Sequence, residues 1–185
     1  MKSAAIFLFA VLFTGGLRAS ESLEIEYYDV HGSTAQALRE AMNRHGPAGE
    51  DGRRFHGYTK WHVRWNFQYR PRGASCEVMS VETSLDVIMT LPRWARPDGA
   101  PAQLEREWER YNAALRAHED GHADLGAAAA REVQRRLSAM SGTSGCPALV
   151  DEMNRTGRAI IEEVRVRELE YDATTGHGAT QGARF

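Results

Sequence analysis

The chain has 185 residues, of which 42% are hydrophobic and 26% charged, and its formal charge is −2. This length suits a single domain with its own hydrophobic core, and the ordinary composition excludes a chain that is disordered throughout. The mild acidity argues against nucleic acid as a partner, because a nucleic-acid-binding domain usually presents a basic face.

Residues 1–19 are expected to be a secretory signal peptide. Lys2 gives a positive start, an apolar run spans residues 4–13, and the segment ends on the small residue Ala19. The run is too short to span a bilayer comfortably, which disfavours the alternative of a membrane anchor. We therefore expect cleavage after Ala19, a single domain over residues 20–185 without a membrane span, and a periplasmic or secreted location.

The mature chain is predicted to begin with a strand followed by a helix. Residues 25–30 form the strand candidate. Ser33 and Thr34 offer capping oxygens for a helix over residues 35–44, and the Gly and Pro of His45-Gly46-Pro47 end it.

Two segments with apolar and polar residues in alternation follow. In residues 61–70 the apolar face runs from Trp61 to Tyr69, and in the second segment it runs from Met79 to Leu91. This period of two indicates strands, and the turn between them predicts an antiparallel hairpin.

Two long helices complete the predicted fold. Over residues 100–140 an apolar stripe recurs at steps of three or four, which is typical of one helix. The stripe comprises Leu104, Trp108, Tyr111, Leu115, His118, His122, Leu125, Ala129, Val133 and Leu137. Residues 147–169 form the second helix, and the tail over 171–178 is expected to be irregular. The predicted fold class is α+β, with a small antiparallel sheet packed against two long helices.

The first of these helices carries the sequence His118-Glu119-Asp120-Gly121-His122. Two histidines at this spacing lie one turn apart on one face, where both can bind a single Zn²⁺ ion, as in a zincin-like helix. Glu119 would then act as the general base that takes a proton from the metal-bound water, which attacks a carbonyl. The alternative is a pair of hydrogen-bonded core histidines, since buried imidazoles need polar partners.

A catalytic zinc site usually has three protein ligands and one open position, so a further ligand must come from elsewhere in the chain. His177 is the one histidine after the motif, and it is the expected third ligand. Asp172 is the main alternative, while Glu162 and Glu163 are weaker ones. Whichever of His177 and Asp172 does not bind metal is a candidate to orient a residue that does.

Tyr171 lies next to the expected ligands and has two interpretations. Its hydroxyl is a candidate to stabilise an oxyanion during hydrolysis. The alternative is a tyrosine that packs at the end of a helix.

The two cysteines, Cys76 and Cys146, are expected to form a disulfide, because an exported protein meets oxidising conditions. A bridge that closes a loop of about 70 residues would stabilise the fold by roughly 4 kcal/mol in the chain-entropy model. The alternative is a pair of zinc thiolates, which lack a neighbouring Cys or His at ligand spacing.

Several segments occur in an order that is typical of one bacterial family. They are Tyr27-Tyr28-Asp29-Val30-His31-Gly32, residues 59–69, Leu91-Pro92-Arg93-Trp94, residues 118–122 and residues 171–178, together with Cys76 and Cys146. On these segments the sequence resembles a family of predicted secreted zinc-dependent proteases, long carried as a domain of unknown function. The resemblance implies export, zinc dependence and, more weakly, protease activity, and it supports a site role for His177 or Asp172.

The sequence thus predicts an exported zinc-dependent metallohydrolase that cleaves peptide bonds. Its partner would be a peptide or protein substrate, with cell-wall peptides as the close variant. The alternative is a non-catalytic exported module that binds zinc or another protein. A closed fourth ligand position would favour that module, whereas an open cleft beside Glu119 would favour the enzyme.

Overall fold

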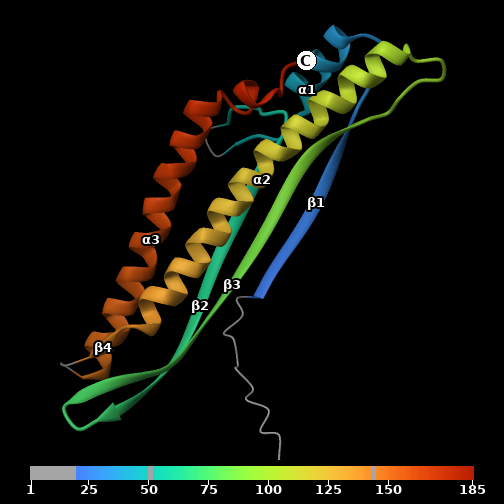
Figure 1. Ribbon diagram of the computed structural model, residues 1–185. Coiled ribbons are helices and arrows are strands. Elements are labelled where there is room, and N and C mark those ends of the chain that lie inside the picture. Colours follow the sequence, from blue (N-terminus) through green and yellow to red (C-terminus); the bar gives the residue numbers. More distant parts are fainter. Residues whose placement is uncertain (1–19, 50–51, 143–144) are drawn as a thin grey trace, which may run out of the picture.

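A computed structural model describes residues 20–49, 52–142 and 145–185 of the chain (Figure 1). The expected signal peptide, residues 1–19, lies outside the described residues, and so does the bond after Ala19 as a cleavage site. Within the described part, no helix combines the length and the apolar character needed to cross a membrane.

The described elements confirm the α+β class. In chain order they are β1 (Ser20–Val30), α1 (Ala35–His45), β2 (Tyr58–Arg72), β3 (Ser75–Trp94), α2 (Ala102–Ser138), β4 (Ser141–Gly142), α3 (Cys146–Thr175) and the short 3-10 helix η1 (Ala179–Gln181). Helix α1 begins as expected, because the Thr34 hydroxyl accepts a hydrogen bond from the Ala37 amide at 3.1 Å.

The sheet is mixed rather than purely antiparallel. β3 is the central strand, with β2 antiparallel on one side and β1 parallel on the other. The parallel pair arises because α1 and the loop after it return the chain to the end of the sheet where β1 finishes. The β2–β3 hairpin then places β3, and not β2, beside β1 (Figure 1).

A bulge changes which residues of the hairpin face the helices. Gln68 pairs with Ser80 and Tyr69 pairs with Val78, so Met79 has no partner in the register. The extra residue lies in β3 and reverses the alternation of that strand beyond this point. Met79 is therefore exposed, at 49%, although the sequence pattern placed it on the apolar face, and its neighbour Val78 packs against the core instead. Tyr69 of β2, also expected on the apolar face, is 45% exposed.

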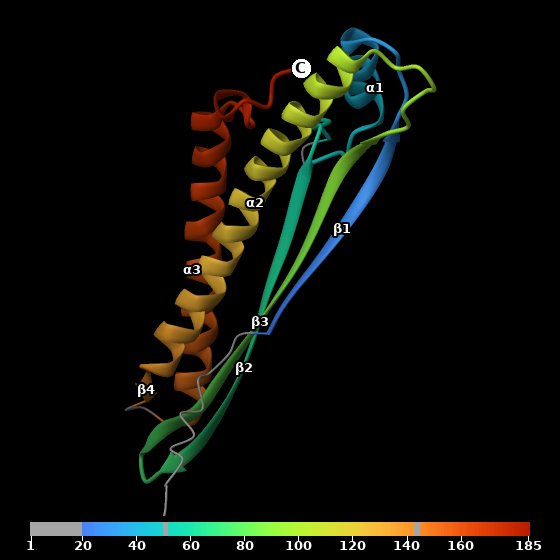
Figure 2. The same ribbon diagram turned by 45° about the vertical axis from the view of Figure 1, so that its right-hand side comes forward.

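The two long helices lie side by side over one face of the sheet, above β2 and β3 (Figures 1 and 2). Two tryptophans of β2 pack against helix glycines, Trp61 against Gly126 of α2 and Trp65 against Gly157 of α3. A Cβ at either glycine would come within 2.7 Å of the indole. The glycines therefore let the helices approach the sheet closely.

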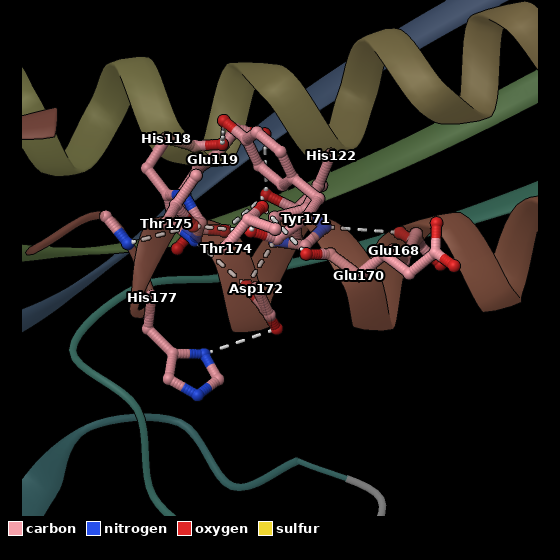
Figure 3. A network of polar contacts seen from close by, with 12 residues as sticks. His118, Glu119, His122, Glu168, Glu170, Tyr171, Asp172, Thr174, Thr175 and His177 are labelled. Atoms are coloured by element: carbon pink, nitrogen blue, oxygen red, sulfur yellow. Dashed lines mark hydrogen bonds and ion pairs between the residues drawn. The ribbon is translucent and has the colours of Figure 1, made fainter. Parts of the chain in front are cut away.

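The predicted apolar stripe of α2 faces the sheet. All its members are buried except Leu125, which is partly exposed. The stripe turns His118 and His122 inward, toward α3 (Figure 3).

Helix α3 continues to Thr175 and so includes residues that were expected to be irregular. Tyr171 packs its ring against both histidines of α2, and Thr175 is buried. These contacts stabilise a last helical turn whose own Asp and Thr residues have weak helix propensity. Gly176, with φ of 56°, ends the helix in the left-handed conformation.

The predicted disulfide between Cys76 and Cys146 is confirmed. It joins β3 to the first residue of α3 across a sequence separation of 70 residues. The link holds the beginning of α3 against the sheet, while Asp172 lies near the other end of that helix.

Candidate metal site

Helix α2 presents three site candidates to the interior within five residues. His118, Glu119 and His122 are 2%, 3% and 9% exposed, respectively. A helix packed on a sheet buries residues at steps of three and four, which explains why both histidines point inward. Glu119 is buried as well, because β2 lies beside this part of the helix.

Asp172 of α3 approaches both histidines (Figure 3). Its Oδ1 lies 3.1 Å from Nε2 of His118 and 3.0 Å from Nε2 of His122. One ligand atom from each of the three residues lies within 4.8 Å of the others. Tetrahedral zinc with bonds of 2.0–2.2 Å would separate its ligands by about 3.3 Å. The three side chains are therefore close enough together to bind one metal ion of this size.

His177 lies outside this group of three. Its Nδ1 is 3.3 Å from Asp172 Oδ2, the oxygen that faces away from the histidines, and its ring packs on Phe55 at 5.3 Å (Figure 3). The structure thus brings Asp172, the alternative third ligand, to the two histidines. It places His177, the expected one, where it can orient Asp172.

The other nitrogen of each histidine also has a partner. Nδ1 of His118 lies 2.9 Å from Oε1 of Gln181, and Nδ1 of His122 lies 3.3 Å from Oε1 of Glu168. An acceptor at Nδ1 holds the proton there and leaves Nε2 available to a metal, which is the usual arrangement around metal-binding histidines.

Sequence reasoning missed both of these partners. Glu168 precedes Asp172 by four residues, so the two share a face once the helix continues past Leu169. That spacing could have identified Glu168. Gln181 carries no comparable sequence signal, because its position depends on how the chain turns after α3.

Tyr171 packs between the histidines and the backbone of α2. Its ring stacks on His118, with centroids 5.0 Å apart, and meets His122 edge-on. Its hydroxyl donates to the His118 carbonyl at 3.3 Å and accepts from the Gln181 amide at 3.0 Å. The single proton of this hydroxyl is thus directed at the His118 carbonyl, and its contribution to an oxyanion site stays a prediction.

Glu119 is held by the first residues of β2. The Thr59 hydroxyl lies 2.8 Å from Oε2 of Glu119. Burial raises the pKa of Glu119, and the Thr59 hydrogen bond opposes this shift only in part. A Cβ at Gly57 would lie 2.6 Å from Oε1, so the glycine makes room for the carboxyl group.

The hydrogen bonds between the histidines and the carboxylates set the charges within the site. Burial disfavours the charged form of His122, but hydrogen bonds to the Asp172 and Glu168 carboxylates outweigh it and raise its pKa to about 9. Burial would also raise the pKa of Asp172, but hydrogen bonds from the two histidines lower it. The site therefore holds carboxylate charge that a proton on His122 partly neutralises and that a bound cation could neutralise instead.

Comparison with known proteins gives one match. The model of a family described as a bacterial protein of unknown function, DUF922, matches residues 25–178. The matched range contains the two histidines, Glu119, Asp172 and His177, and it ends before Gln181. No curated protein and no solved structure matches the chain.

Proposed function

We propose that this chain, which belongs to the DUF922 family of bacterial proteins, is an exported zinc-dependent hydrolase that cleaves peptide bonds. The family description assigns no activity, so the proposal depends on the site. The observation that carries it is the convergence of His118, His122 and Asp172 beside the buried carboxyl group of Glu119.

Two imidazoles and one carboxylate are a ligand set that catalytic zinc uses in hydrolases. Zinc held by three protein ligands would supply a Lewis acid and a water with its pKa lowered to about 7. The proposed ligands are Nε2 of His118, Nε2 of His122 and Oδ1 of Asp172, since these atoms converge.

Glu119 takes the role of general base in this proposal. Glu119 directly follows His118 in the chain, and a hydrogen bond from the Thr59 hydroxyl of β2 holds its carboxyl group. Burial raises its pKa, which brings the carboxylate closer to the working range of a base near neutral pH. The group can therefore accept a proton from the attacking water and pass it to the leaving amine.

The position of β2 supports a peptide as the substrate. β2 forms one edge of the described sheet, and Thr59 near its beginning contacts Glu119. An extended peptide that pairs with a sheet edge gains backbone hydrogen bonds. A peptide paired with the first residues of β2 would pass beside Glu119.

The test compares the purified mature protein with Glu119→Gln. The substitution removes the base and keeps both histidines, so both proteins should hold zinc, as measured by metal analysis. Hydrolysis of casein or of peptidoglycan should fall by about 10²–10⁴-fold in the variant, the range expected for loss of a general base. Failure of both proteins to hold zinc under metal-replete conditions would contradict the central claim.

The second candidate function is a non-catalytic exported module that binds zinc. The burial of the site favours it, since both histidines and Glu119 have less than a tenth of their surface exposed. Under this function both proteins would retain zinc and neither would cleave either substrate.

A further inference from the structure

The last seven residues of the chain, 179–185, form a C-terminal strap that lies beyond the family-matched range. The strap begins with η1 and turns back through hydrogen bonds from the Gln181 and Ala183 amides to the Gly178 carbonyl, both 3.0 Å long. It ends at Phe185, whose ring meets Trp108 and Tyr111 of α2 at 5.8 and 5.0 Å. The strap is therefore held at its beginning by the Gly178 carbonyl and at its end by the aromatic rings of α2.

The strap runs close to His118. A Cβ at Gly178 would lie 3.0 Å from the Cβ of this histidine, and the φ of 82° at Gly178 also favours glycine. This close approach brings the side chain of Gln181 to the far side of the imidazole from Asp172.

The hydrogen bonds of Gln181 orient its side-chain amide. The Tyr171 hydroxyl donates its proton to the His118 carbonyl at 3.3 Å and accepts from the Gln181 amide nitrogen at 3.0 Å. The amide oxygen of Gln181 then faces Nδ1 of His118 at 2.9 Å. An oxygen there can only accept, so the proton of the neutral imidazole belongs on Nδ1 and the lone pair on Nε2.

We infer that Gln181 is a positioning residue for His118 and that the C-terminal strap is part of the metal site. The inference rests on the proposed function in one respect, namely that zinc binds at Nε2 of His118. His122 receives the equivalent support from Glu168, which lies inside the family-matched range. His118 depends on a side chain outside that range.

The test measures the zinc dissociation constant by competition with a chromophoric chelator, using the full mature protein. The variants are Gln181→Leu, which removes the acceptor, and Gln181→Glu, which keeps it. Thr180→Ala is the matched control, since Thr180 is exposed on the same strap. Gln181→Leu should weaken zinc binding on the order of 10–100-fold, the usual effect of losing such a partner. Gln181→Glu and Thr180→Ala should bind zinc nearly as tightly as the wild type.

The outcomes separate this inference from the proposed function. A wild type that binds no zinc defeats the proposed function and this inference with it. Tight zinc binding by the wild type with an unchanged constant in Gln181→Leu overturns the inference alone. Equal weakening in Gln181→Leu and Gln181→Glu also overturns it, because the acceptor at Nδ1 would then be irrelevant. Gln181 is exposed, so neither substitution removes packing from the core.

Discussion

Gly121 lies between the two histidines of α2, in a helix interior where alanine would ordinarily be preferred. A Cβ at this position would lie 2.2 Å from the Tyr171 hydroxyl oxygen and 2.6 Å from the ring carbon that carries it. The glycine thus allows Tyr171 to lie across α2 and to stack on His118. The residue type at 121 is decided by a contact between helices and not by the helix itself.

Gly121→Ala should therefore change stability in opposite directions in two backgrounds. In the wild type it should lower the free energy of unfolding by about 1–3 kcal/mol, because it overpacks the contact with Tyr171. In a Tyr171→Ala background it should raise that free energy by up to about 1 kcal/mol, through helix propensity alone. Denaturant unfolding with a chelator present measures both. A loss of similar size in the two backgrounds would show that Tyr171 is not the cause.

At the scale of elements, His56 joins three parts of the fold just before β2. Its Nε2 donates to Asn43 Oδ1 of α1 at 2.8 Å, and its Nδ1 accepts from the Tyr111 hydroxyl of α2 at 2.5 Å. Its carbonyl accepts from the Tyr28 hydroxyl of β1 at 2.7 Å. Burial lowers the pKa of His56, and the positive charge of Arg39 lowers it further.

These hydrogen bonds predict that acid weakens the contacts of His56 with β1, α1 and α2. The pKa of His56 is lower in the folded state than the unfolded value of about 6.5, so the unfolded chain takes up the proton first. The contribution of neutral His56 to the free energy of unfolding is complete above about pH 6.5, and it is lost as the pH falls through that value toward the pKa of the folded state. Metal-free wild type should thus lose more stability between pH 7.5 and 5 than His56→Gln, as measured by denaturant unfolding at each pH.

The control for this prediction is His62→Gln, because His62 is exposed on β2. That variant should follow the wild-type dependence of stability on pH. If the stability of His56→Gln also follows the wild-type dependence on pH, protonation of His56 does not weaken its contacts with β1, α1 and α2.

At the scale of the whole molecule, the candidate ligands come from two helices that only the folded chain brings together. His118 and His122 lie on α2, and Asp172 lies near the end of α3. An unfolded chain does not hold these side chains in one place, so a metal that binds here binds the folded state. Ligand binding of this kind raises stability according to the free concentration of the ligand.

Zinc should therefore raise the unfolding temperature of the wild type and of His177→Gln, but not that of Asp172→Asn. A free zinc concentration 100-fold above the dissociation constant corresponds to roughly 3 kcal/mol of added stability. Thermal unfolding with and without zinc distinguishes the two candidates for the third ligand. Loss of the zinc effect in His177→Gln, with retention in Asp172→Asn, would assign that role to His177 instead.

Local patterns in the sequence predicted where the long helices and the hairpin lie and that two histidines share one face of a helix, but not where α3 ends. The spacing of His118 and His122 within the apolar stripe of α2 already implies that both face the core, because helical periodicity depends on neighbouring residues alone. The disulfide was predicted without tertiary information as well, because the chain has two cysteines and is expected to be exported.

The third member of the candidate site was decided by tertiary structure. Residues 170–175 contain Asp and Thr, which by propensity predict the end of a helix, so the sequence did not show which of Asp172 and His177 lies beside the two histidines. Packing of Tyr171 on the histidines of α2 extends α3 and turns Asp172 inward, while His177 falls beyond the last turn. Gln181 reaches His118 for a similar reason, because Phe185 anchors the strap in a core built by distant residues. Such contacts depend on how separate elements meet, which no local pattern encodes.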